Sequence, residues 1–147
     1  MNVDVINGKL QASTEHVPAN DAAFAEEIRG WIVDFHSGIK PYSVDMMEQR
    51  IKSYLRQEEL YREKVRFILS LFPDHPMLGL DIGSSAGGLS VELAQAGVEM
   101  HGIEPSTAGV RVSRMRAQRL GINNATFIEG VGERLPFPDE MFDLIVS

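Results

Sequence analysis

The spacing of apolar residues divides the chain into two halves. In the first half, apolar residues recur every three or four positions, which is the period of amphipathic helices. One such stripe follows a helix-start signal at Asn20 or Asp21 and ends before Gly38. Its members are Phe24, Ile28, Trp31, Ile32 and Phe35. The sequence therefore predicts an amphipathic helix between these two signals.

A second and longer apolar stripe extends from Ser43 to Phe72, before a proline-rich stop at residues 73–76. It comprises Met47, Ile51, Tyr54, Leu55, Tyr61, Val65, Ile68 and Phe72. A stretch of roughly 30 residues exceeds the usual length of a globular helix, so we expect a break near Gln57. Residues 20–74 are thus predicted to form a helical cap. Residues 1–19 are polar and unpatterned, and we expect a flexible N-terminal arm there.

After Pro76 the pattern changes to short apolar runs that alternate with helical stretches. Strands are expected at residues 77–82, 98–103, 125–129 and 142–146, and helices at residues 89–96 and 106–120. Strands that alternate with helices form right-handed crossovers and a parallel sheet. We therefore predict a Rossmann-like α/β core, a doubly wound and mostly parallel sheet, over residues 75–147.

Composition narrows the function classes. The 147 residues are 44% hydrophobic and contain no cysteine, and the net charge is −7. This acidity argues against a nucleic-acid partner, because phosphate neutralisation requires clustered Lys and Arg. No apolar run approaches the ~20 residues of a membrane span. A cytoplasmic location is the default, and four scattered histidines without cysteine indicate no metal site.

Small residues follow the first predicted strand of the core. After Asp81 come Gly83, Ser84, Ser85 and Gly87. Glycines let a ligand approach the backbone, and the N-terminus of the next helix favours anionic groups. Short glycine motifs also occur where the chain only makes a tight turn. The loop alone therefore leaves both interpretations open.

Glu104 ends the next apolar run, at the place where a carboxylate can accept both hydroxyls of a ribose. The loop and Glu104 together predict a site for an adenosine-containing cofactor. The loop departs from the dinucleotide fingerprint Gly-x-Gly-x-x-Gly, because Ser85 stands at the middle glycine. A nicotinamide-dependent oxidoreductase is therefore disfavoured.

Three segments resemble the class I S-adenosylmethionine-dependent methyltransferases, in their small-molecule branch. The run 81–87 resembles their first motif, Asp/Glu-x-Gly-x-Gly-x-Gly, and Glu104 matches the acidic residue that ends their second strand. Residues 135–143 read LPFPDEMFD and match the signature Leu-Pro-Phe-x-Asp-x-x-Phe-Asp. The resemblance covers Met77 to Ser147, and the N-terminal half carries no such motif.

The resemblance implies a fold, an activity and a site. The fold is a seven-stranded sheet of order 3-2-1-4-5-7-6, of which this chain carries the N-terminal part, strands 1 to 4. The activity is methyl transfer from S-adenosylmethionine to a small-molecule or lipid-like acceptor, by in-line displacement. Asp81 would hold the amino group of the cofactor, the glycines its methionine part, and Glu104 the ribose. The implied cofactor-binding residues are Asp81, Gly83, Ser84, Ser85, Gly87, Glu104, Pro105, Val131, Gly132 and Glu133.

Two positions depart from the family pattern. Ser85 replaces the usual middle glycine, and Val131 stands where an aspartate commonly accepts a hydrogen bond from adenine. Losing one such bond costs about 1 kcal/mol, or roughly fivefold in affinity. Glu133 or Glu129 could supply the missing acceptor.

No catalytic residue is identified on the acceptor side. His36 and Tyr42 flank the Gly38 turn and are candidates to face the cofactor, whereas Trp31 is expected in the core. The arginines of the helix over residues 106–120 are expected to form a solvated outer face. They are Arg111, Arg114, Arg116 and Arg119.

The last predicted strand, residues 142–146, would lie at an open sheet edge, which is a pairing hazard. We expect this chain to be part of a longer protein, or a second copy to cover the edge by self-association. The chain alone should bind cofactor but not turn over. The main alternative is a non-catalytic module that binds an adenosyl ligand, and Val131 favours it.

Overall fold

A computed structural model describes residues 5–6, 9–10, 19–35, 42–72, 74 and 76–147. Within the segment predicted as an arm it describes two short strands, β1 (Val5–Ile6) and β2 (Lys9–Leu10), which pair antiparallel. The rest of that segment lies outside the described residues, as does His36. Among the described residues, no helix combines the length and the apolar character needed to cross a bilayer.

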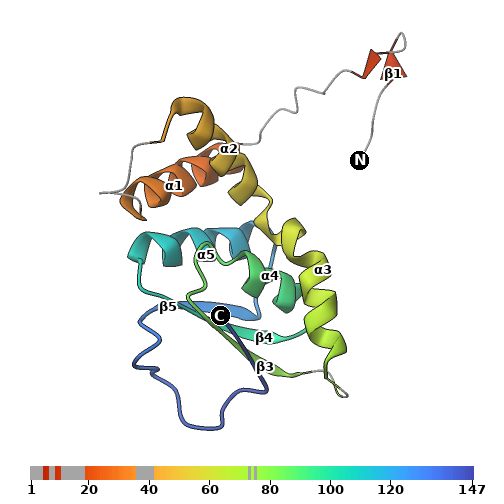
Figure 1. Ribbon diagram of the computed structural model, residues 1–147, viewed down its shortest axis with the longest axis vertical. Coiled ribbons are helices and arrows are strands. Elements are labelled where there is room, and N and C mark those ends of the chain that lie inside the picture. The colour runs from red at the N-terminus through yellow and green to blue at the C-terminus, as the bar shows by residue number, and fades with distance from the viewer. Residues whose placement is uncertain (1–4, 7–8, 11–18, 36–41, 73, 75) are drawn as a thin grey trace.

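Three helices form the N-terminal half (Figure 1). They are α1 (Ala19–Phe35), α2 (Val44–Leu55) and α3 (Gln57–Ser70). Helix α2 begins at Ser43, whose hydroxyl accepts a hydrogen bond from the amide of Met46 at 3.3 Å. The predicted break near Gln57 is confirmed, because Arg56 leaves the helical conformation between α2 and α3.

The second half is a four-stranded parallel sheet with two further helices. Its strands are β3 (Leu78–Ile82), β4 (Glu99–Glu104), β5 (Ala125–Glu129) and β6 (Leu144–Val146). Helix α4 (Gly88–Gln95) connects β3 to β4, and α5 (Thr107–Arg119) connects β4 to β5. The strand order is β5-β4-β3-β6, and all three pairings are parallel. The predicted Rossmann-like α/β core with a parallel sheet is confirmed.

Strand β6 is shorter than predicted, because the residues before it make other contacts. Phe142 packs its ring edge-on against Phe137, with ring centroids 4.9 Å apart, and against His101 at 5.8 Å. The carboxylate of Asp143 accepts hydrogen bonds from the amides of Met77 and Leu78 at 2.9 and 3.0 Å. Phe142 is thus held by aromatic contacts, whereas Asp143 is bonded to the start of β3 through its side chain and through its amide, which donates to the carbonyl of Leu78 at 2.9 Å.

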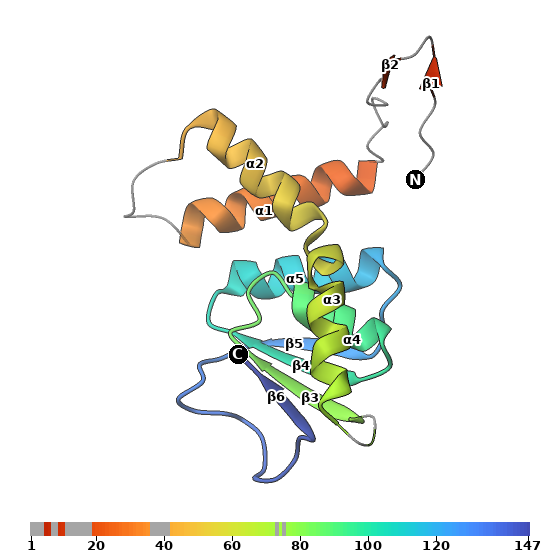
Figure 2. The ribbon, with the colours of Figure 1, turned by 45° about the vertical axis from the view of Figure 1, so that its right-hand side comes forward.

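The two faces of the sheet are covered differently. Helices α3, α4 and α5 lie on one face (Figure 2), where Val65, Leu93 and Met100 belong to one buried cluster. The side chains of paired Leu80 and His101 point to the opposite face, since neighbouring residues alternate along a strand. There the long loop before β6 supplies Phe137 and Phe142.

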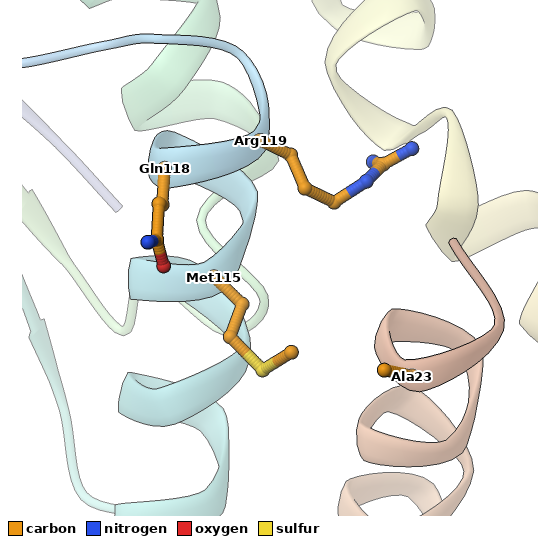
Figure 3. A pocket seen from close by; sticks show the side chains of 4 residues that line it. All are labelled: Ala23, Met115, Gln118 and Arg119. Carbon is orange, nitrogen blue, oxygen red and sulfur yellow. The ribbon is translucent and has the colours of Figure 1, made fainter. Parts of the chain in front are cut away.

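Helix α1 docks on α5 through an apolar cluster flanked by ion pairs. Phe24, Ile28 and Trp31 are buried against Ala108 and Val112. At the edges, Arg111 pairs with Glu27 at 2.6 Å and Arg119 pairs with Asp21. Figure 3 shows Met115 projecting from α5 toward Ala23 of α1, while Arg119 projects from a neighbouring turn of α5 on the same side.

The expected solvated face of arginines on α5 is wrong for Arg116, which is fully buried. Arg111 and Arg114 are exposed as expected, and Arg114 donates to the carbonyl of Phe127 at 2.6 Å. Through the pairs of Arg111 and Arg119 with α1, the basic run also takes part in helix docking.

Candidate functional site

The carboxyl ends of β3, β4 and β5 meet at one edge of the sheet, where parallel α/β sheets bind ligands. The amides of Gly83 and Ser84 donate to the carbonyl of Ile103 at 2.8 and 2.9 Å, and Gly130 donates to Glu104 at 3.2 Å. A Cβ on Gly132 would lie 2.9 Å from Cγ2 of Ile82. The structure thus brings together the three segments that the sequence predicted to form the site.

The loop between β3 and α4, residues 83–87, has a left-handed backbone at three positions. The φ angles are +76° at Gly83, +54° at Ser85 and +74° at Gly87. A Cβ on Gly83 would meet no described atom within 4 Å, whereas one on Gly87 would lie 2.8 Å from Ser113. The absence of a side chain at Gly83 therefore leaves its backbone open to a ligand, and at Gly87 it permits close packing on α5.

Glu104, the last residue of β4, joins two segments of the site. Its Oε2 accepts a hydrogen bond from the amide of Ser85 at 3.0 Å, and its Oε1 accepts one from the amide of Ser106 at 3.1 Å. The residue is only 4% exposed. Because a carboxylate oxygen has two lone pairs, each can still accept a ligand hydroxyl. Its predicted contact with a ribose stays a prediction.

Asp81 is the second buried carboxylate, also 4% exposed. It accepts a hydrogen bond from the hydroxyl of Ser90 at 2.6 Å. Burial raises the pKa of Asp81, and the negative charge of Glu104 acts in the same direction, while Ser90 and Lys64 oppose the shift. A buried carboxylate that is costly to ionise is suited to receive a cationic group of a ligand.

Two buried polar atoms near these carboxylates have no hydrogen-bond partner within the described part of the chain. They are Oγ of Ser84 and Nε1 of Trp31, in residues that are 5% and 3% exposed. A Cβ on Gly109 would lie 3.1 Å from Nε1 of Trp31 and 2.9 Å from Cγ of Glu104. The indole N–H therefore lies beside the Glu104 side chain. Unpaired buried donors are rare in proteins and often mark a ligand site.

The remaining predicted site residues are open to solvent. Val131 is 47% exposed, and Pro105, Gly132 and Glu133 are also exposed. Of the two candidate acceptors for adenine, Glu129 already accepts a hydrogen bond from the hydroxyl of Thr107 at 2.7 Å. Because a carboxylate that accepts one hydrogen bond keeps further lone pairs, both Glu129 and Glu133 remain candidates.

On the acceptor side, the expectation for Trp31 is confirmed. It belongs to the buried cluster and stacks edge-on with Tyr54 at 4.9 Å. Tyr42 packs against the same cluster, and His36 lies outside the described residues. In the ranges that the structure describes, no three His, Asp or Glu side chains are grouped as metal ligands would be.

Two residues of α5 that hold the glycine loop were not predicted. Ser113 donates to the carbonyl of Ser85 at 3.0 Å, and Arg116 donates to that of Ala86 at 2.8 Å. Spacing gave a signal for Arg116, because it continues the stripe of Ala108 and Val112 at intervals of four residues. A charge on an apolar stripe indicates a buried partner.

Comparisons with known proteins agree with this geometry. Residues 80–147 match the family model described as a methyltransferase domain. An uncharacterized methyltransferase of Bacillus subtilis, YcgJ, is 38% identical over 66 residues, which are 45% of this chain and 26% of that protein. A ubiquinone biosynthesis O-methyltransferase of Azorhizobium caulinodans is 32% identical over 78 residues, 53% of this chain and 30% of that protein.

The crystal structure of YcgJ superposes with a TM-score of 0.51 at 29% identity, over 56% of this chain and 36% of that one. This chain spans less than a third of the length of either curated relative. The strand order, the glycine loop and the matched sequence lead to one family, so residues 80–147 belong to the class I S-adenosylmethionine-dependent methyltransferases.

Proposed function

We propose that the α/β half binds S-adenosylmethionine at the carboxyl ends of β3, β4 and β5. We further propose that the protein transfers a methyl group to a small-molecule or lipid-like acceptor. The observation that carries this proposal is the open backbone at Gly83 between two buried carboxylates, Asp81 and Glu104. An amino acid joined to a nucleoside needs such a site, with one carboxylate for an ammonium and one for ribose hydroxyls.

The residues present fit this cofactor. Asp81 would receive the ammonium group, Gly83 and Gly87 the methionine part, and Glu104 the ribose. Ser84 and Ser85 lie in the glycine loop and Pro105 follows Glu104, while Val131, Gly132 and Glu133 would flank the adenine. When bound, the cofactor supplies a methyl group on a sulfonium, which needs no metal and no covalent enzyme intermediate. The tasks left to the protein are to align the acceptor and to exclude water.

The N-terminal helices support the exclusion of water from the site. Trp31 of α1 lies beside the Glu104 side chain, and Tyr54 of α2 packs on its ring. These aromatic side chains would cover the ribose end of a bound cofactor.

The predicted domain boundaries, which separate an arm over residues 1–19, a helical cap over residues 20–74 and the core, remain predictions. Helix α3 packs against α4 and supplies Val65 to the sheet core, so it is structurally part of the α/β half.

The proposed class of methyl acceptor is supported by similarity to a curated relative. The Azorhizobium relative is named for ubiquinone biosynthesis, which supports a small or lipid-like acceptor for this protein as well. No side chain is assigned as a catalytic base, and we propose that the 147 residues alone bind cofactor without turnover. We also propose a cytoplasmic location without nucleic-acid partners, supported by the charge of −7 and the absence of cysteine.

Self-association through β6 is a further proposal. This strand pairs only with β3 among the described strands and so stands at the sheet edge, and Ile145 in it is 59% exposed. Sedimentation over a range of concentrations tests the proposal. The wild-type chain should associate, whereas Ile145→Lys should stay monomeric because a charged edge disfavours strand pairing.

The second candidate function is a non-catalytic module that binds an adenosyl ligand, which Val131 favours because its side chain accepts no hydrogen bond from adenine. A nicotinamide-dependent oxidoreductase is disfavoured, since Ser85 has a side chain where a pyrophosphate needs the closest approach to the backbone.

Calorimetric titration with S-adenosylmethionine, S-adenosylhomocysteine and NAD tests the proposed cofactor. The wild-type chain should bind both adenosyl compounds and not NAD, and Gly83→Ala should abolish binding. Gly121→Ala is the matched control, because Gly121 also has a positive φ (+66°) and open space but lies after α5. Binding of NAD alone would disprove the methyltransferase proposal, and equal loss in both variants would show strain rather than blocked access.

A further inference from the structure

Arg116 is a fully buried arginine, and its three guanidinium nitrogens all have partners. Nε donates to the carbonyl of Ala86 at 2.8 Å. Nη2 donates to the carbonyl of Tyr54, and Nη1 to the carboxylate of Glu58. Ala86 belongs to the glycine loop, whereas Tyr54 and Glu58 lie at the elbow, residues 54–58, where α2 meets α3. One side chain of α5 thus joins two segments that are far apart in the sequence.

The elbow also contacts the loop directly. A Cβ on Gly88 would lie 2.6 Å from Cγ of Gln57, so the elbow packs closely on the first turn of α4. Ala86 itself is fully buried in the cluster that contains Phe24 and Trp31 of α1. The shape of the loop therefore depends on the docking of the N-terminal helices.

The Arg116–Glu58 ion pair is not expected to add much to the free energy of folding. Both residues are buried, at 0% and 6% exposure. Removing two charges from water costs as much as their attraction returns, and an apolar pair of similar volume is often as stable or more so. What an apolar pair cannot do is hold two carbonyl groups in fixed positions, which a planar guanidinium does well.

We propose that Arg116 is a positioning residue for the cofactor loop. Its guanidinium fixes the Ala86 carbonyl to the elbow, so that docking of the N-terminal helices sets the loop for cofactor binding. This inference rests on the proposed cofactor site but assigns Arg116 no contact with the cofactor. The consequence is that a change behind the loop weakens binding without altering any residue that the cofactor touches.

Another arginine of α5 provides the matched control. Arg111 pairs with Glu27 of α1 at 2.6 Å, across the same interface, whereas the carbonyls of the glycine loop accept hydrogen bonds from Ser113 and Arg116. Arg111→Gln therefore removes an ion pair between α1 and α5 and leaves the loop alone. Any difference between the Arg116 and Arg111 variants then reflects the loop rather than helix docking in general.

The test uses the full chain in four forms: wild type, Arg111→Gln, Arg116→Lys, and the double variant Arg116→Met with Glu58→Leu. The double variant removes both buried charges, but it leaves the carbonyls of Ala86 and Tyr54 without their donor, so it should fold with a lower unfolding temperature than wild type. We expect it to bind S-adenosylhomocysteine about tenfold more weakly in calorimetry, a loss of about 1.4 kcal/mol. Arg116→Lys should also bind more weakly, because an ammonium cannot reach all three acceptors. Arg111→Gln should stay within about twofold of wild type.

Hydrogen exchange of the unliganded variants gives a second readout that needs no cofactor. Peptides covering residues 83–88 should exchange faster in Arg116→Lys and in the double variant than in Arg111→Gln, while β3 and β4 stay protected. Wild-type affinity and unchanged loop exchange in a folded Arg116 variant would overturn the inference. If the double variant does not fold, Arg116→Lys decides by the same criteria. Failure of the proposed function would give a different result from failure of this inference. In that case the wild-type chain itself would bind no adenosyl compound.

Discussion

The two loops that border the candidate site are held in opposite ways. In the loop after β3, Ser84, Ala86 and Gly87 are buried, and hydrogen bonds from Ser113 and Arg116 fix its carbonyls. The loop after β5 is exposed over most of residues 130–140 and is held by ring contacts of Phe137. The end of the site that we propose for the methionine and ribose is therefore preorganised, whereas the end that we propose for the adenine is open. Substitutions in the first loop should change stability and binding together, and those in the second should change binding alone.

The largest effect is expected from Gly87→Ala in the first loop. The alanine would adopt a left-handed backbone and place its Cβ 2.8 Å from Ser113. We expect a loss of about 3 kcal/mol in the free energy of unfolding, from strain and overpacking together. Denaturant unfolding measures it. Gly130→Ala in the second loop is the control, because its backbone has no positive φ and its Cβ would lie 3.3 Å from Cγ2 of Ile103, which requires only a small adjustment. Equal losses in the two variants would contradict the difference between the loops.

Glu104→Gln should have the next largest effect. An amide has a single acceptor oxygen, so the backbone N–H of either Ser85 or Ser106 would lose its partner. The expected loss in unfolding free energy is about 1–3 kcal/mol, accompanied by weaker binding of S-adenosylhomocysteine. Glu133→Gln, at an exposed position, should change stability by less than about 0.5 kcal/mol. A Glu104 variant as stable as wild type would show that its two backbone bonds do not hold the loop.

Asp81 gives the preorganised end a pH dependence with a defined sign. Burial raises the pKa of Asp81 above its ordinary value of 3.8, so the folded chain holds the proton more tightly than the unfolded chain does. The contribution of Asp81 to stability is therefore fully present below that value and falls as pH rises through the folded pKa. Asp81→Asn does not titrate there. The unfolding free energy of wild type relative to Asp81→Asn should thus decrease as the pH rises above about 4. An increase over this range would refute the assignment.

Val131→Asp should have the smallest effect on stability and is expected to improve binding. Val131 is 47% exposed, so an aspartate there meets no packing constraint. It would supply an acceptor for the adenine amino group, worth about 1 kcal/mol or roughly fivefold in affinity. Calorimetry with S-adenosylhomocysteine measures the gain, and Glu133→Gln in the same background shows whether Glu133 already fills this role. Unchanged affinity would place adenine elsewhere.

Local signals in the sequence were sufficient for much of the fold. Apolar spacing predicted the helices and strands, the length of the second helical stretch predicted a break near Gln57, and the small residues between β3 and α4 predicted the loop. The strand order was implied by the family resemblance. The contacts of Arg116 with Glu58 and Ala86 could not be predicted this way, because they join residues 30 and 58 positions apart. The backbone bonds of Glu104 were missed because motif spacing describes a ligand and not the loop behind it.

The central claim is that an adenosyl cofactor binds between the ends of β3, β4 and β5. Hydrogen–deuterium exchange of the wild-type chain, with and without saturating S-adenosylhomocysteine, tests it most directly. We predict slower exchange in residues 81–88, 104–106 and 130–133. Exchange should stay unchanged in all residues that belong neither to the site nor to the N-terminal helices. Saturable binding that protects a different surface, or none of these three segments, would contradict the claim.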